Sequence, residues 1–108
     1  MLILFDHGTS APLESFLTNH LVKRAKDLGW DILGNGELLT AAEKAGFEVF
    51  LTTDKNIRYQ QNLAIRKIAI VVIGNPQWPV LRQYVDRIVS AVNTAKRGTY
   101  IEVEIPDR

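Results

Sequence analysis

The sequence predicts an α/β domain with a mainly parallel central β-sheet flanked by helices on both faces. Three observations predict this fold class. Short apolar runs of strand length alternate with helical patterns along the chain. The segment KIAIVVI (Lys67–Ile73) is almost wholly apolar, which is typical of a strand covered on both faces. A long amphipathic helical pattern follows it, and strands that alternate with helices form parallel sheets through right-handed crossovers.

The composition is that of one ordinary folded domain, predicted to span residues 1–108. A chain of 108 residues has room for a single hydrophobic core, and 46% of its residues are hydrophobic. The formal charge of +1 does not indicate a dedicated nucleic-acid binder. The absence of cysteine excludes disulfides and thiolate metal sites. The opening MLILFDHG lacks the features of a signal peptide, and no apolar stretch has membrane-spanning length, so we expect a soluble, cytoplasmic protein.

The first third of the chain is predicted to contain two strands and a short helix. The apolar run Leu2–Phe5 has the length of a buried strand. Ser10 is a suitable helix N-cap and Pro12 suits a first helical turn, so a helix is expected to follow them. A weaker strand pattern covers His20–Ala25, and a loop rich in turn residues covers Gly29–Gly36.

The middle third is predicted to contain a helix, a strand and a second, short helix. From Glu37 the pattern is helical, and Gly46 is a suitable C-terminal glycine. The segment Phe47–Thr53 is rich in β-branched and aromatic residues, as strands are. The short helix is expected over Asn56–Leu63, before the apolar strand Lys67–Ile73.

The last third is predicted to contain one long helix and an edge strand. Apolar residues recur at helical spacing over Val80–Lys96, and Gly98 ends the pattern. The segment Tyr100–Ile105 alternates between apolar and polar residues, which is typical of a half-exposed strand.

Three acidic residues are predicted to meet at one edge of this sheet. Asp6 directly follows the first strand, and Asp54 follows the strand that ends at Thr53. Parallel strands end at the same edge, where the ligands of open α/β sheets bind, so both carboxylates are expected there. Glu37 opens a helix that leads back into the sheet, so it is expected to face the same edge.

A cluster of three carboxylates is electrostatically unfavourable unless a cation neutralises it. Oxygen ligands of this kind suit Mg²⁺ or Mn²⁺, and a hydrated cation can activate water and stabilise charge on a phosphodiester. Each acid also has a structural explanation. Asp6 can be a turn residue, Glu37 can complement the helix dipole, and Asp54 can cap the next helix. The residue pattern alone leaves both explanations open.

The motifs LILFD, GNGELL and FEVFLTTDKNIRYQQNL, in this order, resemble a PIN-like nuclease domain. The match is closest to a short bacterial subfamily associated with toxin–antitoxin pairs, and it covers nearly the whole chain. This resemblance implies a metal-dependent endoribonuclease that hydrolyses RNA phosphodiester bonds. It further implies Asp6, Glu37 and Asp54 as metal ligands and catalytic residues, Mg²⁺ or Mn²⁺ as the cofactor, an antitoxin protein as a partner, and a homodimer as a common assembly.

Two departures from the family pattern favour an alternative. Related short domains carry Asp-Glu-Asn after the first strand, whereas this chain reads Asp6-His7-Gly8. Asn56 stands where larger PIN nucleases carry a fourth acid. Fewer negative ligands weaken metal affinity, so the alternative is a catalytically weak or inactive PIN-like module that binds RNA or an antitoxin.

The residues beside Asp54 are candidates for substrate binding. Lys55 and Arg58 supply positive charge for a phosphate backbone, and Asn56 can donate a hydrogen bond to a phosphate. Tyr59 offers a face for base stacking. A structural explanation, in which Tyr59 covers the core and its neighbours support the loop, is favoured for these flanking residues.

Three other features were weighed. A receiver-like phosphoacceptor domain also gathers acids at strand ends, but FDHG lacks its acidic pair and no lysine follows YIEVEI. His7 is a candidate proton shuttle or an exposed turn residue. The basic residues Lys23, Arg24 and Lys26 are typical of a solvated surface, or alternatively of a contact with RNA or an acidic antitoxin segment.

Overall fold

A computed structural model describes residues 1–57 and 65–106. In these residues the chain forms one sheet of five strands, and every neighbouring pair is parallel. The strand order is β2-β1-β3-β4-β5. The predicted α/β class with a parallel sheet is therefore confirmed. The strand bounds are β1 Leu2–Phe5, β2 Leu21–Arg24, β3 Val49–Thr52, β4 Ala69–Ile73 and β5 Tyr100–Val103.

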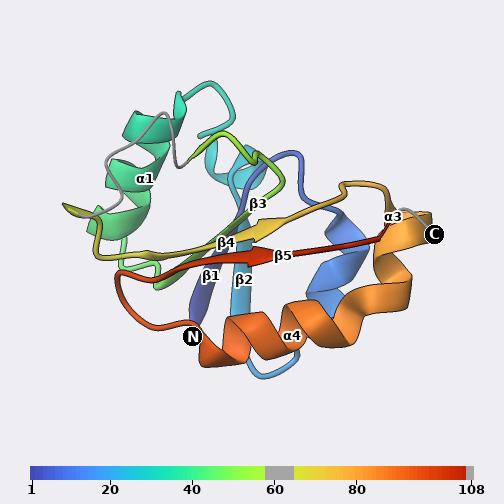
Figure 1. Ribbon diagram of the computed structural model, residues 1–108. Coiled ribbons are helices and arrows are strands. Elements are labelled where there is room, and N and C mark those ends of the chain that lie inside the picture. The colour runs from blue at the N-terminus through green and yellow to red at the C-terminus, as the bar shows by residue number, and fades with distance from the viewer. Residues whose placement is uncertain (58–64, 107–108) are drawn as a thin grey trace.

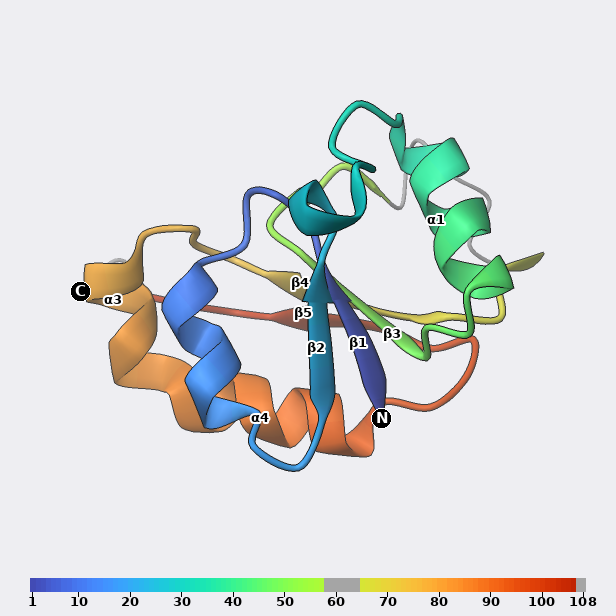
Figure 2. The same cartoon turned by 180° about the vertical axis from the view of Figure 1, so that it is seen from behind.

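Helices cover both faces of the sheet, as predicted. Figures 1 and 2 show α1 on one side of the sheet, and α4 with the 3-10 helix η1 on the other. Among the described residues, no helix combines the length and the apolar character that crossing a membrane requires. The helix bounds are η1 Ala11–Phe16, η2 Lys26–Leu28, α1 Asn35–Lys44, α3 Trp78–Leu81, η4 Arg82–Tyr84 and α4 Val85–Thr94.

Two apolar layers hold these helices on the sheet, because alternate residues of a strand point to opposite faces. Ile3 and Phe5 of β1 pack toward α4, whereas Leu4 packs toward α1. Every residue of β3 and β4 is buried, since both strands lie inside the sheet and are covered on both sides. This confirms the prediction that the apolar run ending at Ile73 is a central strand.

The C-terminal helix differs from the prediction. A single helix over Val80–Lys96 was expected, but α3 begins at Trp78, η4 follows, and α4 runs only to Thr94. Pro79 explains the early start, because proline suits the first turn of a helix. The interruption lies at Tyr84, whose backbone angles (φ −123°, ψ 21°) leave the helical region, so the hydrogen-bond ladder restarts at Val85.

The predicted first helix forms as the 3-10 helix η1, with Ser10 at its N-cap position. The Ser10 side chain does not cap this helix. Its hydroxyl instead donates to the carbonyl of Pro76, 2.8 Å away, and so ties the loop after β1 to the loop after β4. The other short helix, expected over Asn56–Leu63, falls mostly in residues 58–64, which lie outside the described residues.

The strand order indicates a ligand crevice between the carboxyl ends of β1 and β3. From β1 the chain crosses to β2 on one side, and it then returns to β3 on the opposite side of β1. In open parallel sheets, the carboxyl ends of the two strands at such a reversal diverge and leave room for a ligand. The residues that follow β1 and β3 are therefore the first place to look for a functional site.

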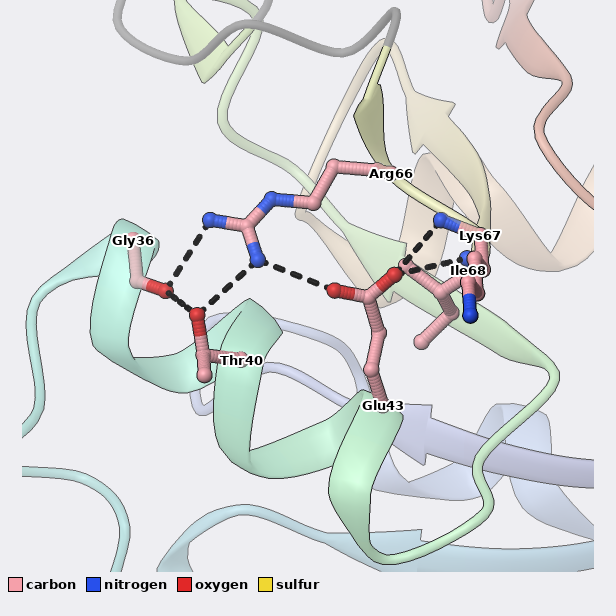
Figure 3. Close-up of polar contacts among 6 residues, drawn as sticks. All are labelled: Gly36, Thr40, Glu43, Arg66, Lys67 and Ile68. Carbon is pink, nitrogen blue, oxygen red and sulfur yellow. Dashed lines mark hydrogen bonds and ion pairs between the residues drawn. The ribbon is translucent and has the colours of Figure 1, made fainter.

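A partly buried ion pair fastens α1 to the start of β4 (Figure 3). The guanidinium of Arg66 donates to Glu43 Oε1 at 2.9 Å, to Thr40 Oγ1 at 2.9 Å and to the carbonyl of Gly36 at 3.3 Å. The other carboxylate oxygen of Glu43 accepts hydrogen bonds from the backbone N–H groups of Lys67 and Ile68. The Arg66 and Glu43 side chains are only 15% and 20% exposed, so water screens this pair weakly.

This network makes the stability of the fold depend on pH in the acidic range. Burial alone would raise the pKa of Glu43, but the hydrogen bonds from Lys67, Arg66 and Ile68 outweigh it and lower the pKa below 4.5. A lowered pKa stabilises the fold above the unfolded value, and that stability is lost as the pH falls through the folded value. We therefore expect the stability difference between the wild type and Glu43→Gln to be constant near neutral pH and to shrink below about pH 4.5. Urea titrations across this range measure it, and a difference that stays constant into strong acid would contradict the assignment.

Candidate functional site

Asp6 and Asp54 lie beside each other at the carboxyl ends of β1 and β3. The two strands are paired in parallel, with Phe5 opposite Leu51. The backbone N–H of Asp6 donates to the carbonyl of Leu51 at 2.9 Å, which continues the ladder to the end of β1. Both aspartates are therefore at the edge and at the strand reversal where the sequence places them.

One hydroxyl joins the two aspartates. Thr52, the last residue of β3, is fully buried, and its hydroxyl donates to Asp6 Oδ2 at 2.8 Å. The hydroxyl oxygen of Thr52 also accepts the backbone N–H of Asp54 at 3.1 Å. Thr52 thus fixes both the Asp6 carboxylate and the turn that carries Asp54. The sequence analysis missed this role, although a threonine at the end of a buried strand needs a polar partner and is a usable signal.

The carboxylate of Asp54 is fixed from two directions. Its Oδ1 accepts the backbone N–H of Asn56 at 2.9 Å, which is the capping arrangement considered as the structural explanation. Its Oδ2 accepts a hydrogen bond at 2.9 Å from the side-chain amide of Asn35, the first residue of α1. Asn35 is therefore the residue through which α1 reaches the site, and the sequence analysis did not identify it.

The carboxylate of Asp6 contacts His7 through its remaining oxygen. Asp6 Oδ1 accepts the backbone N–H of His7 at 2.9 Å and lies 3.2 Å from Nδ1 of the same residue. The Asp6 side chain is 12% exposed and the imidazole is 66% exposed, so the carboxylate is largely shielded from solvent and the ring is not. His7 is an exposed turn residue, and its role as a proton shuttle stays a prediction.

The structure does not bring Glu37 to the two aspartates. Glu37 is exposed and lines a surface hollow with Lys44 and Arg66 on the outer side of α1. Residues two apart in a helix point about 200° away from each other, so Asn35 faces Asp54 and Glu37 faces away. In residues 1–57 and 65–106, no three His, Asp or Glu side chains are close enough to hold a metal ion together. The expected convergence of three carboxylates is therefore reduced to two.

The donor set still suits a hard divalent cation. The two aspartates bring four carboxylate oxygens to the ends of neighbouring strands, and Asp6 Oδ2 and both oxygens of Asp54 each have one hydrogen-bond donor described above. A carboxylate oxygen carries two lone pairs, so these oxygens retain capacity for a cation. Mg²⁺ commonly binds through one or two carboxylates, several waters and the phosphates of its substrate. Asp6 and Asp54 fit that pattern without a third acid.

The expected substrate-binding residues fall into two groups. Lys55 and Asn56 are exposed and directly follow Asp54, so both can meet a ligand at the edge. Arg58 and Tyr59 lie outside the described residues. In the basic cluster, Lys23 and Lys26 are exposed, whereas Arg24 contacts Glu14 at 3.3 Å.

No family model, curated protein or solved structure matches this chain. The resemblance to PIN-like domains therefore rests on the sequence motifs alone.

Proposed function

We propose that this chain is a ribonuclease that uses Mg²⁺ or Mn²⁺ to hydrolyse RNA phosphodiester bonds, with Asp6 and Asp54 as the metal ligands. One observation carries the proposal: Asp6 and Asp54, from distant parts of the chain, follow the neighbouring parallel strands β1 and β3, and the Thr52 hydroxyl bonds to both residues. Open parallel sheets bind their ligands there. The motifs shared with PIN-like nucleases supply the reaction class.

The protein's own contribution is to hold the carboxylates and the substrate in place. Thr52 and Asn35 fix the rotamers of Asp6 and Asp54, which lowers the cost of organising the site when ligands arrive. Lys55 is exposed and directly follows Asp54 in the chain, so its cation can attract a phosphate at this edge of the sheet. When bound, the divalent cation supplies an activated water and neutralises charge on the phosphate.

The same motifs support a biological role as a toxin that is paired with an antitoxin protein. They also support a homodimer of this chain. A second candidate function is an RNA-binding or antitoxin-binding module without cleavage. The distance of Glu37 from the site and the sequence Asp6-His7-Gly8 favour it, because both reduce the negative charge available to a cation. Measured RNA cleavage separates the two candidates.

Mn²⁺ is expected to raise the melting temperature of the wild type. A cation that binds only the folded state stabilises it by about 2.7 kcal/mol at a hundredfold excess over Kd. For a domain of this size that corresponds to a rise of roughly 10 °C or more. Asp6→Asn and Asp54→Asn should each lose most of the rise, because each removes one of two charged ligands.

Asp31→Asn is the matched control, since Asp31 is exposed and lies in the loop before α1. It should keep the wild-type response to Mn²⁺ in the same thermal-shift titration. An equal rise in all four proteins would mean that the cation binds elsewhere.

A further inference from the structure

A cavity opens at the opposite edge of the sheet, where the strands begin, which we call the amino edge. It has a volume of about 510 Å³ and lies where β3 and β4 begin and α4 has just ended. Phe47 precedes β3, Lys67 and Ile68 precede β4, and Lys96 and Arg97 follow α4. The carboxylates of the candidate nuclease site lie at the other ends of these strands, so the two sites are separate.

The floor of this cavity is apolar. Phe47, Ile68 and Ala95 line it and are 7%, 2% and 8% exposed, so each shows only a small patch to the cavity. The volume lies within the range of natural small-molecule sites, which are mostly apolar with a few charged groups. The floor is suited to the flat or branched apolar part of an organic molecule.

Three cations line the same cavity without a partner in the described part of the chain. The side chains of Lys67, Lys96 and Arg97 have no ion pair or hydrogen bond with any described residue. Two acids also line it, so the three cations leave one net positive charge among the side chains of the lining. Glu43 accepts from Arg66, Lys67 and Ile68, and Glu48 accepts the backbone N–H of Leu2 at 3.2 Å.

The backbone that carries the cations is held in place. Glu43 binds the N–H groups of Lys67 and Ile68 (Figure 3). The carbonyl of Lys67 accepts the N–H of Gly98 at 2.9 Å. The turn after α4 is closed by Thr99, whose hydroxyl accepts the N–H of Lys96 at 3.1 Å. A site whose walls are fixed in advance loses less free energy on binding.

We propose that this cavity binds an organic anion with a phosphate or carboxylate head and an apolar body. The head contacts Lys96, Arg97 and Lys67, since a guanidinium matches such groups with paired hydrogen bonds. The body lies over Phe47 and Ile68. The binding site is independent of the nuclease proposal, because no residue of one site belongs to the other.

AMP is a suitable probe, because it combines a phosphate head with a flat base, and adenosine lacks only the head. Titration of AMP into ¹⁵N-labelled protein should shift the NMR amide signals of Lys67, Ile68 and Lys96. AMP should bind at least tenfold more tightly than adenosine. A separate titration with benzoate tests whether a carboxylate head replaces the phosphate. Because AMP also resembles a fragment of RNA, the position of the shifted signals decides the outcome.

Lys96→Glu should weaken AMP binding at least tenfold at the amino edge. Arg82→Glu makes the same change of charge on an exposed residue away from the cavity, and it should bind AMP as the wild type does. The proposal is overturned if millimolar AMP and benzoate both leave the amino-edge signals in place. It is equally overturned if only signals around Asp6 and Asp54 move, an outcome that would support the nuclease site instead.

Discussion

Asp54→Asn is expected to reduce metal-dependent RNA cleavage at least a hundredfold. Asparagine keeps the shape of the side chain and can still accept the N–H of Asn56, so the turn after β3 should be retained. It removes one of the two negative charges that hold the cation in the proposed mechanism. A loss of about 2.7 kcal/mol of transition-state stabilisation corresponds to this factor. Initial rates on a fluorescent single-stranded RNA, with and without Mn²⁺, measure it.

Two controls make this result specific. Asp31→Asn should cleave at the wild-type rate, because Asp31 is an exposed residue outside the crevice. Glu37→Gln should lose much less activity than Asp54→Asn, since the structure places Glu37 on the outer side of α1. A greater loss in Glu37→Gln than in Asp54→Asn would restore the three-ligand site implied by the family resemblance. Equal cleavage by the wild type and Asp54→Asn would remove Asp54 from the site.

Glu43→Gln is expected to destabilise the fold by about 2 kcal/mol, which is roughly 10 °C in melting temperature. The carboxylate accepts from Arg66 on one side and from two backbone N–H groups on the other (Figure 3). An amide has only one oxygen, so its NH₂ group must face donors on one of these sides. The mostly buried charge of Arg66, or the start of β4, then lacks an acceptor. Urea denaturation at neutral pH measures the loss.

The exposed pair of Arg24 and Glu14 provides the comparison. Its side chains are 42% and 45% exposed, and exposed pairs contribute about 1 kcal/mol or less. Glu14→Gln should therefore cost much less than Glu43→Gln. In a double-mutant cycle, Glu43→Gln with Arg66→Met should show a coupling that the exposed pair lacks. Equal losses at the two sites would show that the network in Figure 3 does not fasten α1 to β4.

The sequence predicted the strands best where burial leaves a clear pattern. The run ending at Ile73 is recognisable because a central strand covered on both faces has to be apolar throughout. The strand β2 is harder to identify, since it lies at the edge and exposes Leu21 and Lys23. The break at Tyr84 was missed, because the apolar spacing of α3 and α4 continues across it.

The candidate site was predicted in part, and the limit is a matter of geometry. Parallel strands end at the same edge whatever their order, so the shared location of Asp6 and Asp54 follows from the chain direction alone. Their adjacency depends on β1 pairing with β3, which long-range packing decides. The choice between Asn35 and Glu37 depends on the rotation of α1 about its axis, and a shift of two residues reverses it.

The central claim is that Asp6 and Asp54 share one divalent cation between the ends of β1 and β3. A crystal soaked in Mn²⁺, measured for anomalous scattering, tests it most directly. The account predicts a single strong peak in contact with a carboxylate oxygen of each aspartate, about 2.0–2.3 Å away, with water completing the shell. A crevice without a peak, while Mn²⁺ binds at Glu37 or elsewhere on the surface, would contradict it.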